Sequence, residues 1–159
     1  MIHLEPLAKT DRDRVDHVAV LPEQEPFCGS IEHHFAADEP SCDFNIVVRD
    51  RTVVGFFKID RDYAAQYRFA NKGELGLRGL MIDAREQGRG TGKAAMAALR
   101  TYVSRLYPDA TALVLTVNIV NDRALAVYLA AGFEDTGELH YGGKIGPQHI
   151  LRLRLKDTG

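Results

Sequence analysis

Apolar runs separated by polar turns predict most of the strands of this chain. Residues 44–49 and 52–59 are apolar and rich in β-branched side chains, and the two residues between them are enough for a hairpin turn. Residues 111–117 form a continuous apolar run, which is typical of a strand buried on both faces. Residues 149–155 alternate leucine with arginine, the period of a half-buried strand. Weaker patterns predict three more strands, at residues 2–4 (ended by Pro6), 74–83 and 139–141.

Two long segments repeat apolar residues at helical spacing. The first begins after Gly92 and is predicted to run to about Tyr107, where Pro108 ends it. The second is predicted to begin with a cap at Asn121 and to run to Ala131, because Gly132 suits the residue that leaves a helix. The core-facing stripe of the first helix is predicted to be Ala95, Leu99, Tyr102, Val103 and Leu106.

Two shorter helices are predicted near the start of the chain. Thr10 can cap a helix over residues 10–20, with Val15 and Val18 on one face, and Ser30 can cap another over residues 31–37. Residues 60–72 are polar and aromatic, and are predicted to be an irregular link. The aromatic side chains of this link either line a substrate cleft or simply cover the sheet, and the sequence leaves both interpretations open.

Because strands flank each long helix, the chain is predicted to be an α/β (α+β) domain. We expect a mixed, mostly antiparallel sheet of six to seven strands flanked by about four helices. With 159 residues, the chain is long enough for a core that needs neither disulfides nor metal, so residues 1–159 are expected to form a single domain.

Composition and charge exclude several classes of partner. The net charge of −2 gives no electrostatic case for binding nucleic acid or an anionic membrane. No apolar run is as long as a membrane span, and the polar start does not look like a signal peptide. Cys28 and Cys42 have no metal-ligand spacing and are too few for a disulfide scaffold. We therefore expect a cytoplasmic protein without a metal, and nothing in the sequence opposes a homodimer.

The segment around which the chain is organised runs from residue 80 to residue 93. An apolar strand pattern leads into Gly88, Gly90 and Gly92, and a helix pattern follows. Glycines allow a ligand to approach the backbone closely, and the first turn of a helix offers unpaired N–H groups at the positive end of its dipole. With Arg85, Arg89 and Lys93 adding positive charge, the segment predicts a site for a phosphate or pyrophosphate.

Two familiar phosphate motifs do not fit this segment. A P-loop requires glycine five residues before Gly92 and serine or threonine after Lys93, but Gln87 and Ala94 stand there. Residues 90–95 fit the dinucleotide pattern G-x-G-x-x-A, yet the strand over residues 111–117 ends without the acidic residue that should bind the ribose. A nucleotide-dependent enzyme therefore remains only as an alternative.

A third pattern fits both this segment and a later one. Gln87-x-x-Gly90-x-Gly92 resembles the Q/R-x-x-G-x-G/A loop that binds the pyrophosphate of acetyl-CoA in the GNAT superfamily of N-acetyltransferases. The sequence from Asn121 to Phe133 resembles the second signature of that superfamily, N-x-x-A-x-x-x-Y-x-x-x-G-F. The resemblance covers roughly residues 44–155, and it implies a sheet that is splayed near its centre with acetyl-CoA in the V-shaped gap.

The resemblance also implies roles for particular residues. The backbone N–H groups around Leu80, Met81 and Ile82 are expected to bind the thioester oxygen and the pantetheine arm, and Tyr128 is expected to protonate the departing thiolate. Asn121 can serve both as helix cap and as a partner of the cofactor arm. The residues expected to hold the pyrophosphate are Gln87, Gly88, Arg89, Gly90, Thr91, Gly92 and Lys93.

The general base and the acceptor amine are less well determined. Glu74, on the central strand, is the first candidate for the base, although Gly76 and Gly79 predict a bulge or a close ligand approach that makes its orientation uncertain. Glu32 is the second candidate, but the segment Glu32-His33-His34 is also typical of a solvated helix face.

The expected reaction is direct transfer of an acetyl group to a primary amine of a small molecule. Residues 80–88 and the segment Leu21-Pro22-Glu23-Gln24-x-x-Phe27 look similar to bacterial polyamine (spermidine/spermine) N-acetyltransferases. The alternatives are a protein, peptide or amino-acid N-acetyltransferase, and a catalytically silent module that binds acetyl-CoA. The amine is expected to enter between residues 30–37 and 60–72. A covalent route would need Cys28 or Cys42, and neither has a motif around it.

Overall fold

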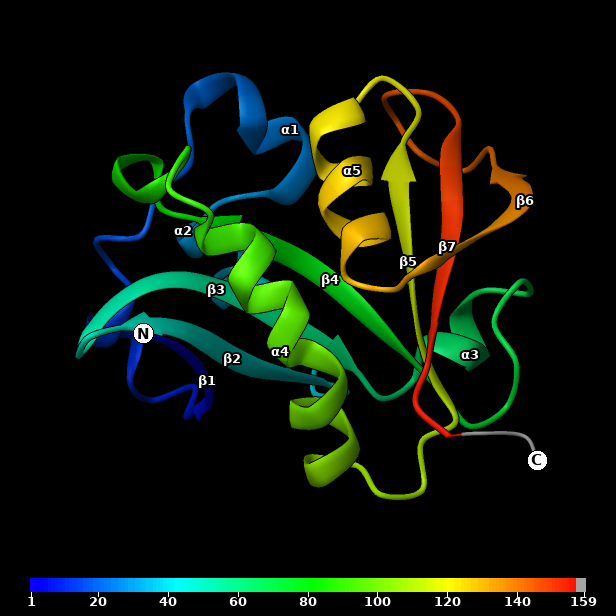
Figure 1. Ribbon diagram of the computed structural model, residues 1–159, viewed down its shortest axis with the longest axis horizontal. Helices are drawn as coiled ribbons and strands as arrows, with labels where there is room; N and C mark the ends of the chain where they lie inside the picture. Colours follow the sequence, from blue (N-terminus) through cyan, green and yellow to red (C-terminus); the bar gives the residue numbers. More distant parts are fainter. Residues whose placement is uncertain (157–159) are drawn as a thin grey trace.

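The computed structural model describes residues 1–156, and it has all seven strands in one sheet (Figure 1). The order is β1-β2-β3-β4-β5-β7-β6, and every neighbouring pair is antiparallel except β4 and β5. The predicted mixed, mostly antiparallel sheet is therefore confirmed; residues 157–159 of the expected domain lie outside the described part. The strands are β1 (Ile2–Leu7), β2 (Cys42–Arg49), β3 (Thr52–Asp60), β4 (Glu74–Ile82), β5 (Ala112–Asn118), β6 (Glu134–His140) and β7 (Gln148–Arg154).

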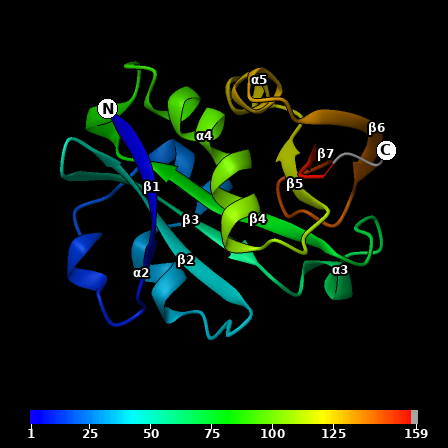
Figure 2. The same ribbon diagram turned by 60° about the horizontal axis from the view of Figure 1, so that its bottom comes forward.

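Helices cover both faces of the sheet. The two long ones, α4 and α5, lie on one face, while the short α2 and α3 lie on the opposite face (Figure 2). The α-helices are α1 (Glu25–Cys28), α2 (Ile31–Ala36), α3 (Tyr63–Gln66), α4 (Thr91–Leu106) and α5 (Asp122–Ala130), and the 3-10 turns are η1 (Arg12–Arg14), η2 (Pro22–Gln24) and η3 (Ala84–Glu86). Both long helices and the helix capped by Ser30 were predicted, with ends within about two residues of those observed.

The core has a separate apolar cluster on each face of the sheet. On the α4 side, Ala95, Leu99 and Val103 of the predicted stripe are fully buried, and so is Met96, which the stripe omitted. The prediction for Leu106 was wrong. Its side chain is 41% exposed because α4 ends at this residue and its last turn extends beyond the apolar cluster.

A β-bulge in β4 determines which side chains face α4. Phe56 pairs with Met81 and Lys58 with Arg78, so Phe57 stands opposite two residues, Gly79 and Leu80. Gly79 has φ +64°, a conformation that favours glycine. The bulge confirms the prediction made from the glycines. At Gly76, a neighbouring side chain and not a ligand requires glycine, because the Tyr63 ring lies where a Cβ would be.

The pairing between β4 and β5 is short, and this opens the sheet. It joins Glu74–Gly76 to residues 112–114, after which the two strands diverge. On its other edge, β5 pairs with β7 along its whole length, so beyond Val114 the edge of β5 that faces β4 is unpaired. The sheet is thus splayed at its centre, as the resemblance implied.

Two predictions for the first twenty residues were wrong. Residues 10–20 do not form an α-helix, because η1 covers three residues and consecutive i→i+3 turns at Val15 and Val18 give both side chains a buried position without one. Pro6 does not end the first strand: β1 continues to Leu7, with Pro6 opposite Asn45. Proline is tolerated there because β1 is an edge strand.

Candidate active site

The gap between β4 and β5 is a cleft of about 1030 Å³. Its floor comes from the ends of these two strands, and its rim comes from η2, α1, the glycine loop and α5. Small-molecule sites commonly have volumes of about 300–1,000 Å³, so this cleft is at the upper end of that range.

The glycine loop forms one end of the cleft, where α4 begins. Gly90 is the N-cap residue of α4 and has φ +79°, as has Gly88, and a Cβ on either would meet no heavy atom within 4 Å. No side chain among residues 1–156 caps this helix, so within that part of the chain the N–H groups of its first turn are available. The open backbone and the positive end of a 16-residue helix fit a pyrophosphate, as predicted from the sequence.

The side chains of this loop mostly hold the loop itself. Thr91 Oγ1 accepts a hydrogen bond from Arg49 Nη2 at 2.7 Å, and Arg49 Nε donates to Glu86 Oε2 at 3.1 Å. Arg89 forms an ion pair with Glu86 and does not line the cleft. Arg85 likewise pairs with Asp83, so Lys93 is the cation of the three predicted ones that faces the ligand site. The hydrogen bonds of Arg49 to Thr91 and Glu86 were not predicted from the sequence, because they join residues far apart in it.

Gln87, the first residue of the pyrophosphate motif, fastens the loop to η2. Its Nε2 donates to Ile82 O at 3.0 Å and to Gln24 Oε1 at 2.8 Å, and Gln24 Nε2 donates back to Gln87 Oε1 at 3.0 Å. Gln24 Oε1 also accepts from Leu21 N. The motif glutamine therefore positions the loop and the end of β4 through side chains, while the glycines leave space.

The amide pair between Gln24 and Gln87 gives a testable coupling. We expect Gln24→Ala and Gln87→Ala each to weaken acetyl-CoA binding several-fold, and the double variant to be little worse than either single one. Residues in one hydrogen-bond network typically couple by about 0.5–3 kcal/mol. Calorimetric titration of the four proteins measures the coupling, and strictly additive losses would mean that the pair does not position the loop.

The end of β4 supplies backbone groups to the cleft. Leu80 and Ile82 line it, whereas the Met81 side chain is 1% exposed and packs in the apolar cluster on the opposite face. Since β5 has diverged at this level, the backbone groups of Leu80 and Ile82 on that side are not used in a ladder with β5. Any contribution of Met81 to a ligand would therefore have to come from its backbone.

Tyr128 lies in the same cleft and its side chain is buried. It packs edge-on against Phe133, with ring centroids 5.5 Å apart. Its hydroxyl has no hydrogen-bond partner in the part of the chain that the structure describes, and it is not sealed from the cleft. Burial raises the pKa of Tyr128 well above its ordinary value, with the nearby Cys28 adding to the rise, so the hydroxyl stays protonated.

Asn121 and Cys28 complete this part of the cleft. Asn121 Oδ1 accepts from Ala124 N at 3.3 Å, which confirms the predicted helix cap, and the residue also lines the cleft. Burial, with a smaller contribution from Glu25, raises the pKa of the Cys28 thiol to about 11. A thiol in this environment is a poor nucleophile at neutral pH, because the thiolate is the reactive form.

Neither candidate for the general base lies in this cleft. Glu74 is at the opposite end of β4 from Leu80, about 20 Å away at about 3.3 Å per residue, and lines a different hollow. Its carboxylate is bound to Arg152 by hydrogen bonds of 2.7 and 3.0 Å, and it accepts a third from Asn71 N. Glu32 is exposed on α2 and does not line the cleft.

The other end of the cleft, away from the glycine loop, is formed by β3, β4 and α3. Tyr63 and Tyr67 line it, which supports the first of the two interpretations left open for this link; Phe69 packs behind them. His34, which was expected on a solvated face, is buried on Phe56 with its Nε2 2.7 Å from Cys28 O. Burial and the nearby Lys58 lower the pKa of His34 to about 4, so it is neutral.

Within residues 1–156, no group of three or more His, Cys, Asp or Glu side chains is placed to hold a metal ion. The same residues contain no helix with the length and apolar character needed to cross a membrane.

Comparison with known proteins establishes the family. Residues 10–133 match the model of the acetyltransferase (GNAT) family, and the chain belongs to that family. An uncharacterized N-acetyltransferase of Bacillus subtilis, YbbJ, is 33% identical over 107 residues. That match covers 67% of this chain and 66% of the relative, so the chain spans just under two thirds of the relative's length.

Solved structures share the fold over almost the whole chain. Aminoglycoside acetyltransferase AAC(6')-Ib in complex with coenzyme A has a TM-score of 0.76 at 16% identity, covering 97% of this chain and 95% of that one. A chimera built from the spermidine N-acetyltransferase of Vibrio cholerae has a TM-score of 0.70 at 14% identity, covering 97% and 95%. The TM-scores show that the fold is shared, whereas identities this low do not identify the acceptor substrate.

Proposed function

We propose that this protein transfers an acetyl group from acetyl-CoA directly to the amine of a small molecule. One observation carries the proposal: a glycine-lined helix start and a tyrosine hydroxyl, neither with a side-chain partner among the described residues, share a single cleft. The helix start suits the binding of a pyrophosphate, and the tyrosine hydroxyl can act as a proton donor. Membership of the GNAT family and the coenzyme A complex of a structural neighbour support the same conclusion.

Each part of the cleft then has a role. The N–H groups at Gly90–Lys93 hold the pyrophosphate, and the free backbone of Leu80–Ile82 binds the pantetheine arm and the thioester oxygen. One N–H donor to such an oxygen is typically worth about 10²–10³ in rate. Tyr128 donates its proton to the departing thiolate, and Asn121 binds the arm besides capping α5.

The raised pKa of Tyr128 is compatible with this role. A phenol of high pKa gives up its proton only to a strong base. A thiolate in water is a weaker base than such a phenolate, because its thiol has a pKa of about 8.5. The nearby Cys28, however, has its thiol pKa raised to about 11 by burial. A thiolate leaving in the same environment is also a stronger base than in water, which favours the transfer.

The environments of the two cysteines favour direct transfer over a route through an acetylated cysteine. Cys28 lines the cleft but is held as a neutral thiol. Cys42 is buried away from the cleft lining, and burial raises its pKa as well. The Cys28 thiol donates to the backbone carbonyls of Gln24 and Gly29, and among the described residues neither thiol donates to a side-chain base, so neither is suited to carry an acetyl group.

The finer predictions about substrate and setting remain proposals. A polyamine acceptor is suggested by the resemblance in residues 21–27 and 80–88 and by one structural neighbour, although Lys58 and Arg78 also line the cleft. A catalytically silent module that binds acetyl-CoA is the alternative. A cytoplasmic location and a homodimer are likewise kept as predictions.

An acetylation assay tests the proposal. Free thiol released from acetyl-CoA is followed with a panel of amines, amino acids and aminoglycosides, and thermal shifts are measured with acetyl-CoA, NAD and ATP. A ligand at a hundred times its Kd stabilises by about 2.7 kcal/mol. Stabilisation by NAD or ATP in preference to acetyl-CoA would overturn the proposal. Stabilisation by acetyl-CoA with no turnover on any amine would favour the silent module.

For Glu74, we expect a structural role. Glu74→Gln should leave the pH profile of kcat/KM unchanged in shape and lower the free energy of unfolding by about 1.5–3 kcal/mol, because it weakens a buried charged hydrogen bond to Arg152. Urea denaturation and rate measurements across pH check both parts. Glu138→Gln is the control, since it removes the same charge from an exposed site. Loss of one limb of the pH profile in Glu74→Gln alone would restore it as the base.

A further inference from the structure

Two cations form the acceptor end of the cleft. Lys58 on β3 and Arg78 on β4 are directly paired across the two strands, and both line the cleft. Lys58 is 2% exposed, which is rare for a lysine. The carboxylates that line the cleft are elsewhere: Glu23, Glu25 and Glu86 come from η2, α1 and η3, at the end where the glycine loop lies.

Two carboxylates bind these cations: Asp60, which is fully buried, and Glu39, which is partly exposed. Lys58 Nζ donates to Glu39 Oε1 at 2.8 Å, and Arg78 Nη1 donates to Glu39 Oε2 at 2.7 Å and to Asp60 Oδ2 at 3.2 Å. Burial alone would raise the pKa of Glu39, but hydrogen bonds from Lys58 and Arg78 bring it down to about 2. Asp60 is fully buried and also accepts from Ser41 Oγ, so it is not available to a ligand.

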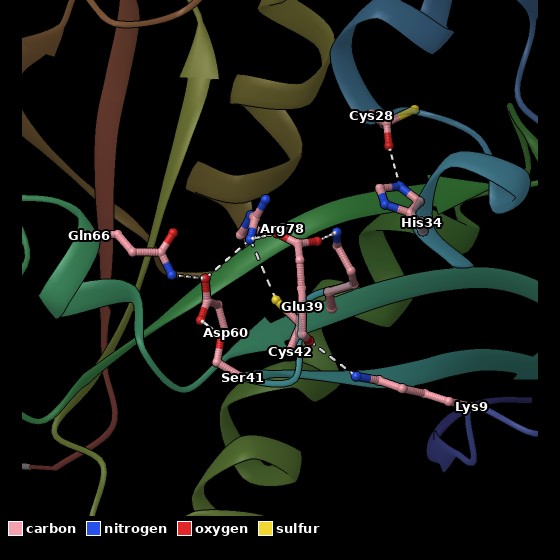
Figure 3. A network of polar contacts seen from close by, with 10 residues as sticks. Lys9, Cys28, His34, Glu39, Ser41, Cys42, Asp60, Gln66 and Arg78 are labelled. Carbon is pink, nitrogen blue, oxygen red and sulfur yellow. Dashed lines mark hydrogen bonds and ion pairs between the residues drawn. The ribbon is translucent and has the colours of Figure 1, made fainter. Parts of the chain in front are cut away.

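The Arg78 guanidinium has one edge committed and one edge free. Figure 3 shows Arg78 turned toward Glu39, Cys42 and Asp60, and all of its hydrogen bonds to these residues come from Nη1. Nε and Nη2 have no partner among the residues that the structure describes, and neither atom is sealed from the cleft. A guanidinium presents its free donors in a planar fork that matches a carboxylate.

We propose that the acceptor is a small amine that also carries a carboxylate, as an amino acid does, and that Arg78 binds the carboxylate. The inference rests on the proposed function and names the substrate class of the same site. Glu39 and Asp60 balance the charges of Lys58 and Arg78, so the free N–H donors of Arg78 decide the preference. A polyammonium ion offers no acceptor to these donors, whereas a carboxylate offers two.

The position of Arg78 on β4 limits the distance between the two groups of the acceptor. Arg78 precedes Leu80 by two positions, about 7 Å along a strand. For the transfer, the amine nitrogen must come within about 3–3.5 Å of the thioester carbon, which the proposed function places beside Leu80. A carboxylate separated from the amine by one or a few carbons can therefore reach Arg78 while the amine is in place.

Matched pairs of ligands test the proposal. Lysine is compared with cadaverine, ornithine with putrescine, and phenylalanine with phenethylamine, because the members of each pair differ only by the carboxylate. For each, kcat/KM is measured with acetyl-CoA, and Kd is measured by calorimetry on the protein saturated with coenzyme A. A site that bonds a polar substrate group discriminates strongly against the analogue that lacks it. We expect the amino acid of at least one pair to exceed its amine by about 100-fold or more in kcat/KM, with a corresponding difference in Kd.

A conservative variant assigns the effect to the guanidinium. Arg78→Lys keeps the charge but loses the fork, so it should reduce the preference for the carboxylate by at least about tenfold in both measurements. Arg61→Lys is the control, because Arg61 pairs with Asp43 outside the cleft. Unchanged affinity for acetyl-CoA in Arg78→Lys shows that the cleft is intact.

The outcomes separate this inference from the proposed function. Acetylation of cadaverine, putrescine or spermidine at rates equal to or above those of the amino acids would overturn the carboxylate inference and leave the acetyltransferase standing. An unchanged preference in Arg78→Lys would overturn the role of Arg78. Failure to bind acetyl-CoA would overturn the proposed function itself. If acetyl-CoA binds but no amino acid binds the coenzyme A complex more tightly than its amine, the inference fails without any turnover.

Discussion

Tyr128→Phe is expected to lower kcat about 10²–10⁴-fold with little change in the KM for acetyl-CoA, which is the range typical of general acid catalysis. The substitution removes the one hydroxyl that opens onto the cleft from α5 and leaves the ring packed on Phe133. Because the hydroxyl has no partner among residues 1–156, its loss leaves no buried group unsatisfied there, and the fold should be unaffected. Steady-state kinetics with the best acceptor of the panel measures the effect.

Tyr102→Phe is the matched control for this experiment. Tyr102 is half-buried on α4, its hydroxyl donates to Asn45, and it does not line the cleft. Its removal should cost about 1 kcal/mol of folding free energy and leave kcat unchanged. If the two variants turn over at the same rate, Tyr128 has a packing role and the proton reaches the thiolate by another path.

A methyl group on Gly90 should weaken acetyl-CoA binding by at least about tenfold, or about 1.4 kcal/mol. The Cβ would occupy open space at the N-terminus of α4, where the pyrophosphate approaches the backbone. Because φ is +79° at Gly90, alanine also strains the backbone by about 1–2 kcal/mol. Loss of binding must therefore be distinguished from loss of stability.

Gly137→Ala makes that distinction. Gly137 on β6 has φ +82°, a Cβ there would also meet no atom within 4 Å, and the residue lies outside the cleft. Both variants should lose similar stability in urea, and only Gly90→Ala should lose affinity in calorimetric titration. Equal affinities of the two variants for acetyl-CoA would place the pyrophosphate elsewhere.

Local signals predicted much of this structure correctly. Most of the strand patterns, Pro108 after α4, the Asn121 cap and the glycine loop each depend on residues close in sequence, and the structure contains these features. The strand predicted at residues 139–141 overlaps only the end of β6 (Glu134–His140), whose polar sequence shows no strand pattern. The segment over residues 10–20 shows where such signals fail. Apolar residues three apart at Val15 and Val18 suit a helix, but they suit consecutive tight turns equally well, and burial against β2 decides between them.

The interior of the site depended on contacts that sequence spacing does not encode. Glu74 was predicted to act as the general base because it lies on the central strand, but the sheet opens at the other end of that strand. Which end opens is decided by the pairing of β4 with β5, residues nearly forty positions apart. Arg49 and Lys58 carried no motif, and their importance comes from the partners that the fold brings to them.

The divergence of β4 and β5 also creates two strand edges inside the sheet. Unpaired strand edges are usually a liability, because they pair with neighbouring molecules and promote aggregation. At its outer limits this sheet protects itself: β1 carries Pro6, and β6 carries the charged residues Glu134, Asp135 and Glu138. The inner edges line a cleft with α5 on its rim. The unpaired backbone that would be a liability at the outer edge of the sheet is here part of the cleft lining, where the proposed function pairs it with the pantetheine arm.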